Sequence, residues 1–88
     1  MYYTYVLLCT KNNASKFYIG STENIEQRII QHRSKNVKTT KIYNTIELVY
    51  YEACLNKSDA RIRELQLKTG FGRGYLKRRI ENFLRKRD

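Results

Sequence analysis

The sequence lacks proline and tryptophan, and its 88 residues include only one methionine, one histidine and two cysteines. It also lacks a long apolar run, so no segment approaches the length that a membrane span requires. The first residues, Met1-Tyr2-Tyr3-Thr4-Tyr5, have neither the basic region nor the apolar stretch of a signal peptide. These absences predict a cytoplasmic protein without a membrane partner.

The cysteines and the histidine do not have the spacing of a metal site. Cys9 and Cys54 lie far apart, each in an apolar context typical of a strand. Two cysteines and one histidine without ligand spacing argue against a zinc site. We expect two buried thiols in a reducing compartment, and nothing in the sequence demands a disulfide.

Acidic residues are scarce, with 8 Asp and Glu against 18 Lys and Arg, which gives a formal net charge of +10. Residues 57–88 hold eleven of the basic residues and only four of the acidic ones. A polyanion is the natural partner of such a chain. An acidic membrane surface is a weaker alternative, because the apolar positions of the basic C-terminal helix are needed for a core. A solubilising or ribosome-associated role is the other alternative.

No repeat or low-complexity tract divides the chain, and its length suits one domain over residues 1–88. The apolar pattern predicts strands at 2–9, 16–20 and 46–53, and helices at about 24–35, 56–67 and 74–87. The segments expected to be loops are 11–15, 36–45 and the glycine-rich 68–74. We therefore predict an α+β fold of order β-β-α-β-α-α, with a small three-stranded antiparallel sheet flanked by helices.

Two side chains suited to phosphate chemistry lie on the first helix. Asn24 is expected to cap this helix, with Gln27 as its capping-box partner. Arg28 and His32 are four residues apart, so they share an arc of about 100° with Ile29. Because both residues border the apolar stripe, we expect them to point toward the sheet.

Strand and helix periodicity also assign faces to the later elements. In the third strand, alternation places one face at Ile46, Leu48 and Tyr50, with Val49 on the other. In the second helix, the residues that share a face are Ala60, Glu64 and Leu67. A carboxylate is therefore expected on the apolar face of that helix.

These residues resemble a GIY-YIG nuclease domain of the small, single-domain prokaryotic type. The second signature triplet is intact as Tyr18-Ile19-Gly20, whereas the first is reduced to Tyr3-Thr4-Tyr5 and lacks the Gly and Ile of the family. Arg28 and His32 stand at the family's helix positions, and residues 63–70 resemble the segment around its metal-binding glutamate. The element order also fits, so the resemblance covers nearly the whole chain.

The resemblance implies hydrolysis of DNA phosphodiester bonds with one Mg²⁺ or Mn²⁺ ion. The products would carry 5′-phosphate and 3′-hydroxyl ends. Such cleavage needs an activated water and a stabiliser for the charge on the phosphate. The catalytic residues that the resemblance implies are Tyr5, Tyr18, Arg28, His32 and Glu64.

The two tyrosines come from the two strands. Tyr5 would be the general base, and Tyr18 would hydrogen-bond water or phosphate. Because a free phenol has a pKa of about 10, the pKa of Tyr5 would have to be lowered for action near neutrality. Lys16, Arg28 and the metal are the candidates for lowering it. The alternative is that both tyrosines are strand aromatics that pack in the core.

Arg28 and His32 also have two interpretations each. Arg28 would contact the scissile phosphate with its fork of donors, and His32 would orient Tyr5 or accept its proton. Alternatively, Arg28 forms a surface ion pair with Glu23 or Glu26, and His32 is a packed or capping residue.

Glu64 would be the metal ligand. A hard cation such as Mg²⁺ needs a carboxylate and tolerates several waters, so one glutamate plus phosphate oxygens suffices. The alternative is an ordinary helix pair with Lys68 at i,i+4. The position of Glu64 on the face of Ala60 and Leu67 favours the functional interpretation.

The binding surface is expected on basic residues around the glycine-rich segment and on the second strand. The candidate nucleic-acid-binding residues are Lys16, Lys68, Arg73, Lys77 and Arg78. Gly70, Gly72 and Gly74 would let backbone N–H groups approach phosphates, or they form a plain flexible turn. Tyr43 and Phe71 could stack on exposed bases, or they cover the edge of the core.

The sequence therefore predicts a metal-dependent DNA endonuclease. With no appended recognition module, we expect selectivity for single-stranded, flap or branched DNA, in repair, recombination or processing. The alternative is a non-catalytic or partner-dependent nucleic-acid-binding module with the same fold.

Overall fold

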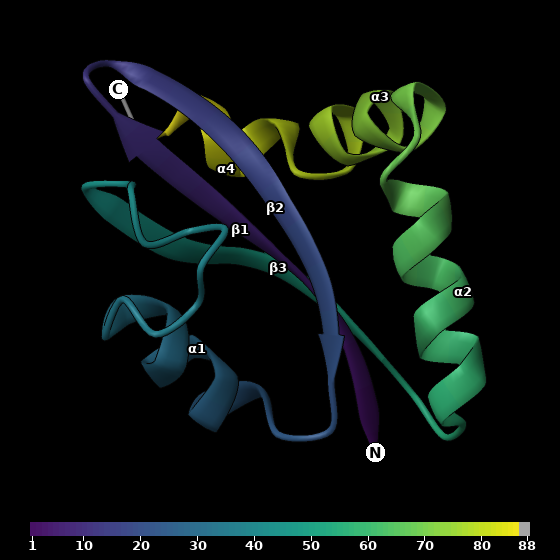
Figure 1. The fold of residues 1–88 in the computed structure, drawn as a ribbon. Coiled ribbons are helices and arrows are strands. Elements are labelled where there is room, and N and C mark those ends of the chain that lie inside the picture. Colours follow the sequence, from purple (N-terminus) through teal and green to yellow (C-terminus); the bar gives the residue numbers. More distant parts are fainter. Residues whose placement is uncertain (87–88) are drawn as a thin grey trace.

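The computed structural model describes residues 1–86 as a three-stranded antiparallel sheet with helices on both faces (Figure 1). The strands are β1 (Tyr2–Lys11), β2 (Ala14–Thr22) and β3 (Thr45–Cys54), in the order β2-β1-β3. The helices are α1 (Ile25–Arg33), α2 (Lys57–Leu67), α3 (Gly70–Arg79) and α4 (Glu81–Arg85). The predicted α+β class and element order are confirmed, with the expected last helix divided into α3 and α4.

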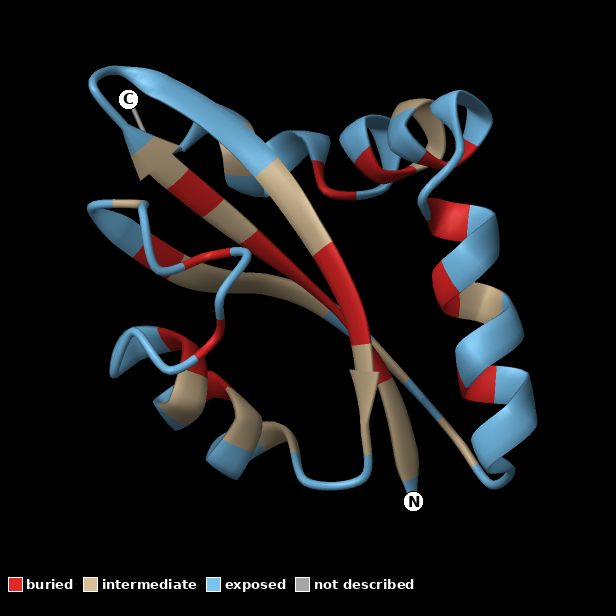
Figure 2. Cartoon of the chain, in the orientation of Figure 1, coloured by how far each residue is buried: buried red, intermediate tan, exposed pale blue. Residues whose placement is uncertain are grey.

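The central strand β1 is buried on both faces and separates two small cores (Figure 2). The core on the side of α1 contains Tyr5, Leu7, Cys9, Ile29 and Ile46. The core on the side of α2 and α3 contains Val6, Ile19, Leu67 and Leu76. We call these the first and second core clusters. Because side chains alternate along a strand, neighbouring residues of β1 serve different cores.

The described residues can be compared with two expectations, one about the cysteines and one about membrane spans. Cys9 and Cys54 are both free thiols, but only Cys9 is buried, whereas Cys54 is half-buried. Within residues 1–86, none of the helices combines the length and apolar character that a bilayer crossing requires.

The β1–β2 connection is a two-residue turn. Asn12 and Asn13 have φ angles of 52° and 69°, and Lys11 already pairs with Ala14. Asparagine tolerates this left-handed conformation, which suits the tight turns of β-hairpins. The predicted loop over residues 11–15 is therefore too long, because both strands continue up to the turn.

Strand β3 contains a bulge at Val49. Val6 pairs with Tyr50 and Leu7 pairs with Leu48, so Val49 is an extra residue on β3. Tyr50 consequently packs against the second core cluster, whereas Leu48 packs against the first. The expected alternation, with Tyr50 and Leu48 on one face, is wrong because the bulge interrupts it.

The predicted starts of α1 and α2 are confirmed by their caps. The side chain of Asn24 accepts a hydrogen bond from the backbone N–H of Gln27 at 3.0 Å, and Asn56 caps α2 in the same way through Ser58 at 2.8 Å. At the other end of α1, Lys35 has a φ of 65° and the backbone closes in hydrogen bonds typical of a Schellman motif.

The glycine-rich segment is part of a helix rather than a turn. α3 begins at Gly70, and the side chain of Thr69 caps it by accepting from Gly72 N at 3.0 Å. A Cβ at Gly72 would lie 2.5 Å from Leu67 Cα, so the close approach of α2 and α3 requires glycine there despite its low helix propensity. The predicted helix over 74–87 therefore starts four residues after the observed start of α3. Its predicted end is also wrong, because α3 ends at Arg79 and a separate helix follows. Residue 87 itself lies outside the described residues.

This packing predicts opposite effects for two glycines of one helix. Gly72→Ala should lower the free energy of unfolding by about 1–3 kcal/mol, because backbone atoms of α2 must move. At Gly74 a Cβ would meet only the Arg78 side chain at 3.5 Å, so Gly74→Ala should be neutral or stabilising by up to about 1 kcal/mol. Urea denaturation measures both changes, and equal stability of the two variants would contradict the packing described here.

Candidate active site

The Tyr5 side chain is buried against a glycine of the neighbouring strand. Tyr5 is 1% exposed and pairs across the sheet with Gly20. A Cβ at Gly20 would lie 2.5 Å from the Tyr5 hydroxyl oxygen. The glycine of the second triplet therefore provides the space in which the Tyr5 hydroxyl lies.

Helix α1 brings two polar side chains to this hydroxyl. The Tyr5 hydroxyl lies 2.9 Å from His32 Nε2 and accepts a hydrogen bond from Arg28 Nε at 3.2 Å. The Tyr18 ring of β2 lies 5.0 Å from the His32 ring, centre to centre. Four of the five predicted catalytic residues are thus brought together, and Arg28 and His32 point toward the sheet as predicted.

Two hydrogen bonds fix the position of the Arg28 side chain. Its Nη1 donates to Gln31 Oε1 at 2.9 Å, in addition to the bond from Nε to Tyr5. Within residues 1–86 it forms no ion pair with Glu23 or Glu26, which was the alternative interpretation. The hydrogen bond to Tyr5 raises the pKa of Arg28, which therefore stays charged.

A threonine that the sequence did not single out completes the group. His32 Nδ1 lies 2.8 Å from Thr40 Oγ1, and both residues are fully buried. In the tautomer with the imidazole proton on Nδ1, facing Thr40, His32 Nε2 accepts the proton of the Tyr5 hydroxyl, whose oxygen accepts from Arg28. Thr40 lies in the polar segment between α1 and β3, and its spacing from His32 follows no helix or strand period. No local pattern marks it.

Burial sets the protonation of both central groups. Burial raises the pKa of Tyr5 to about 12, although the hydrogen bond from Arg28 opposes this rise. Burial, with the nearby Arg28 charge, lowers the pKa of His32 to about 4. Without substrate or metal, the pKa of Tyr5 is therefore not lowered as the role of general base would require, because the hydrogen bond and charge of Arg28 do not outweigh burial. At neutral pH the site holds a neutral phenol, a neutral imidazole and a charged guanidinium.

His32 predicts a pH dependence of stability. Its pKa is near 6.5 when unfolded and about 4 when folded, so between these values the unfolded chain binds more protons. The free energy of unfolding should therefore fall as the pH drops from 6.5 toward 4, with a slope approaching about 1.4 kcal/mol per pH unit. Urea midpoints at pH 7 and pH 5 measure this fall. His32→Gln should remove most of the difference, and an unchanged difference would assign it to other groups.

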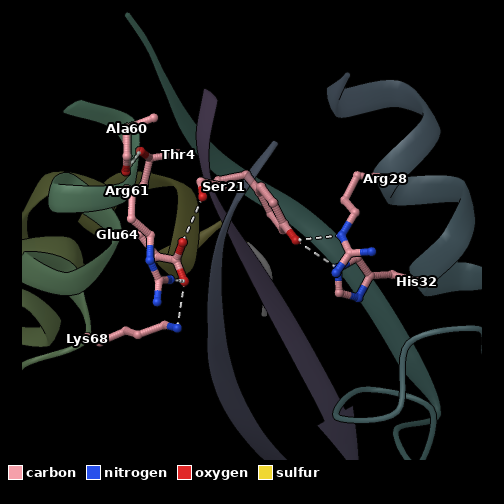
Figure 3. Close-up of polar contacts among 9 residues, drawn as sticks. Thr4, Ser21, Arg28, His32, Ala60, Arg61, Glu64 and Lys68 are labelled. Carbon is pink, nitrogen blue, oxygen red and sulfur yellow. Dashed lines mark hydrogen bonds and ion pairs between the residues drawn. The ribbon is translucent and has the colours of Figure 1, made fainter. Parts of the chain in front are cut away.

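The fifth predicted residue, Glu64, is a buried carboxylate on α2. It is 5% exposed, and its Oε1 accepts from the Ser21 hydroxyl at 2.8 Å. Its Oε2 accepts from Arg61 at 2.8 Å and from Lys68 at 2.6 Å (Figure 3). Burial opposes ionisation, but the hydrogen bonds from Lys68, Ser21 and Arg61 outweigh it and lower the pKa of Glu64. Glu64 is therefore an ionised carboxylate at neutral pH.

The edge strand β2 lies between the two groups of side chains. Gly20 and Ser21 are consecutive, so they face opposite sides of the sheet, Gly20 toward the Tyr5 hydroxyl and Ser21 toward Glu64. Figure 3 shows the Glu64 group on one side of the strand, with Arg28 and His32 on the other. Because β2 is at the edge of the sheet, a phosphate bound over this edge can be approached from both sides.

A divalent ion at Glu64 would have to take its other ligands from water and substrate. Within residues 1–86 no group of three His, Cys, Asp or Glu side chains could hold a metal on its own. Mg²⁺ keeps several waters and commonly takes one or two protein carboxylates together with phosphate oxygens. The side chains of Arg61 and Lys68 are 58% and 46% exposed, so both can leave Glu64 for solvent or phosphate.

The predicted DNA-binding residues lie in three places. Three of them line one groove between β2 and α3, namely Lys16, Arg73 and Lys77. Lys68 instead pairs with Glu64, and Arg78 is exposed on α3 outside this groove. Of the two candidate stacking residues, Tyr43 packs against the first core cluster, whereas Phe71 is 87% exposed.

Comparison with known families identifies the class of protein. The sequence model described as the GIY-YIG catalytic domain matches residues 1–78. The chain therefore belongs to the GIY-YIG family, as the second triplet, the helix residues and Glu64 predicted. Membership of this family implies nuclease activity and DNA binding.

Several bacterial proteins are similar to this chain over most of its length. A UPF0213 protein from Staphylococcus haemolyticus is 39% identical over 69 residues, which cover 77% of this chain and 80% of the relative. A UPF0213 protein from Staphylococcus saprophyticus is 38% identical with the same coverage. A UPF0213 protein from Clostridium perfringens is 36% identical over 77% of this chain and 71% of the relative. No solved structure matches the chain.

Proposed function

We propose that this protein is a metal-dependent endonuclease that hydrolyses phosphodiester bonds in DNA. The observation that carries the proposal is the pairing, across one edge strand, of a buried Tyr5 hydroxyl held by Arg28 and His32 with the ionised Glu64. Donors and charges fixed in advance on both sides of a phosphate are what stabilises its developing negative charge.

In this proposal Tyr5 takes the proton of the attacking water. Because its pKa is about 12, the phenol must first pass its own proton to His32 Nε2, 2.9 Å away. The negative charge of a bound phosphate would raise the pKa of His32, and Arg28 together with a bound metal ion would stabilise the phenolate that the transfer leaves on Tyr5. Arg28 then donates to the phosphate oxygens, and Tyr18 lines the same side of the strand.

We propose Mg²⁺ or Mn²⁺ as the cofactor, held by Glu64 with the help of the substrate. Bound there, the ion would polarise the scissile phosphate and offset its charge. The Ser21 hydroxyl keeps Glu64 Oε1 oriented toward β2, and Lys68 and Arg61 are free to follow the DNA backbone.

The substrate that we propose is single-stranded, flap or branched DNA rather than a specific duplex sequence. A DNA backbone must curve around the edge of β2 to contact both Arg28 and Glu64. Duplex DNA resists sharp bending, whereas an unpaired strand follows such a curve readily. Repair, recombination or processing of DNA in the cytoplasm is the setting that this selectivity suits.

Metal removal is the first test of the proposal. We expect the wild-type protein to cut labelled single-stranded or flap DNA in the presence of Mg²⁺ and to leave all substrates intact in EDTA. Excess Mg²⁺ should restore cleavage, and a ligase should rejoin the ends of a nicked substrate, since 5′-phosphate and 3′-hydroxyl products are expected. Binding without cleavage on single-stranded, duplex and flap DNA at every metal concentration would contradict the proposal.

A non-catalytic or partner-dependent DNA-binding module is the second candidate. The observation that favours it is the resting state of the site, where Tyr5 has a pKa of about 12 and Glu64 is paired with Lys68 and Arg61. This candidate predicts DNA binding that is indifferent to Mg²⁺, with no cleavage by the protein alone.

A further inference from the structure

A groove of about 590 Å³ lies between the β1–β2 hairpin and the last two helices. Leu8 and Phe17 are register partners in β1 and β2 and form one wall, and Leu84 of α4 contributes from the opposite side. All three side chains are half-buried, so each keeps apolar surface in the groove. Figure 1 shows α4 behind β2 near the hairpin end of the sheet, with α3 between α4 and the end of α2.

The same groove is lined by three basic residues and no acidic one. Lys16 comes from β2, whereas Arg73 and Lys77 are one helical turn apart on α3 and so share a face. All three are exposed, and within residues 1–86 none forms an ion pair with a carboxylate. Their charge is therefore not compensated by any carboxylate of the described residues, and it is complementary to phosphate.

An aromatic wall beside a row of cations is the combination that binds single-stranded nucleic acid, because bases stack on the ring and phosphates pair with the charges. We infer that this groove holds an unpaired nucleotide of a DNA strand, with its base against Phe17 and its phosphates on Lys16, Arg73 and Lys77. The inference rests on the proposed function for the class of ligand.

The location of the groove connects it with the candidate active site. Phe17 and Ser21 lie on the same face of β2, four residues and roughly 13 Å apart. With phosphates spaced by about 3.4 Å along a strand of a duplex, and farther apart in an extended strand, a few nucleotides span this distance. A strand anchored by one base in the groove would therefore pass Ser21 and Glu64. A duplex offers no unpaired base to this groove, so the groove would select unpaired DNA.

The test separates base docking from phosphate binding. Fluorescence anisotropy in EDTA compares an oligothymidine with an abasic oligonucleotide of the same length, so that the number of phosphates is equal and no cleavage occurs. Wild-type protein should bind the oligothymidine more tightly. Phe17→Leu, which keeps an apolar side chain, should weaken oligothymidine binding by roughly tenfold and leave the abasic affinity unchanged. Phe71→Leu removes the other candidate stacking ring, which does not line this groove, and should change neither affinity.

A second pair of variants tests the cationic wall. Lys77→Glu should weaken binding of both oligonucleotides and reduce the slope of log affinity against log salt by about 0.7 for each phosphate that the protein no longer neutralises. Lys41→Glu makes the same change in net charge on the exposed segment between α1 and β3, so its effect should be clearly smaller.

Three results would overturn the inference: equal affinity of the wild type for both oligonucleotides, equal weakening of both by Phe17→Leu, or weakening by Phe71→Leu instead. The inference and the proposed function fail differently. Base-dependent binding in the groove without metal-dependent cleavage would contradict the proposed nuclease activity and support the nucleotide site. Metal-dependent cleavage with base-independent binding would support the nuclease activity and contradict the nucleotide site.

Discussion

Replacing Glu64 with glutamine should reduce DNA cleavage by roughly a thousandfold or more, because the substitution removes the carboxylate that we propose as the metal ligand. Glutamine keeps the size of the side chain and can still accept from Ser21, so the helix should pack as before. Lys68 and Arg61, both exposed, regain solvent when the charge is removed. Binding of DNA in EDTA should persist and even strengthen slightly, since one negative charge leaves a basic surface. Single-turnover cleavage and anisotropy on the same substrate measure the two effects.

The chain offers a matched control for this substitution. Glu52 is also an ionised glutamate in contact with α2, where it accepts two hydrogen bonds from Arg63 at 2.9 Å each. The hydrogen bond from Arg63 lowers the pKa of Glu52, as the donors around Glu64 lower its pKa. Glu52→Gln should therefore lower stability modestly and spare cleavage. Equal cleavage by both variants at the wild-type rate would show that Glu64 is only the ion-pair partner of Lys68.

Replacing Gly20 with alanine should reduce DNA cleavage by displacing Tyr5, which lies on the face of β2 opposite Glu64. The added Cβ would lie 2.5 Å from the Tyr5 hydroxyl oxygen and 2.7 Å from Cζ, so the ring must move. Any movement breaks the hydrogen bonds of the hydroxyl with His32 and Arg28, and we expect cleavage to fall by roughly a hundredfold or more. Overpacking should also lower the free energy of unfolding by about 1–3 kcal/mol. Cleavage rates and urea denaturation give the two numbers.

Two further variants distinguish this cause from a general effect of alanine. A Cβ at Gly70 meets nothing within 4 Å, so Gly70→Ala should leave both cleavage and stability close to wild type. In a Tyr5→Phe background the closest clash partner is absent, and Gly20→Ala should then lower stability less than it does alone. If the stability changes of Gly20→Ala and Tyr5→Phe simply add, the strain does not arise at the Tyr5 hydroxyl.

Local sequence signals predicted the elements whose causes are local. The asparagines at 24 and 56 cap the helices where expected, and the aromatic and β-branched residues of β1 form a strand as predicted. The errors occur where a long-range contact decides the structure. Gly72 belongs to a helix because α2 packs against its backbone, and the bulge at Val49 follows from pairing with β1. Neither contact leaves a trace in the neighbouring residues.

The candidate site shows the same division. The i,i+4 spacing of Arg28 and His32 correctly predicted that they face the sheet, and the face shared by Glu64 with Ala60 and Leu67 is buried as expected. Thr40 could not be predicted, because only the folded chain brings it to His32. The pKa of Tyr5 could not be predicted either, because it depends on how completely the ring is covered rather than on which cations lie nearby in the sequence.

The bulge in β3 has a consequence for aligning related chains. Because Val49 is the extra residue, a chain without it keeps Leu48 opposite Leu7 and Tyr50 opposite Val6, so Glu52 stays on the face of Arg63. A one-residue deletion between Tyr50 and Glu52 would instead turn Glu52 to the opposite face, and α2, which carries Glu64 one residue after Arg63, would lose a hydrogen-bonded anchor to the sheet. A one-residue gap is therefore compatible with the fold at the bulge and not beyond it. The number of residues between Tyr50 and Glu52 should be counted before a glutamate in a relative is equated with Glu64.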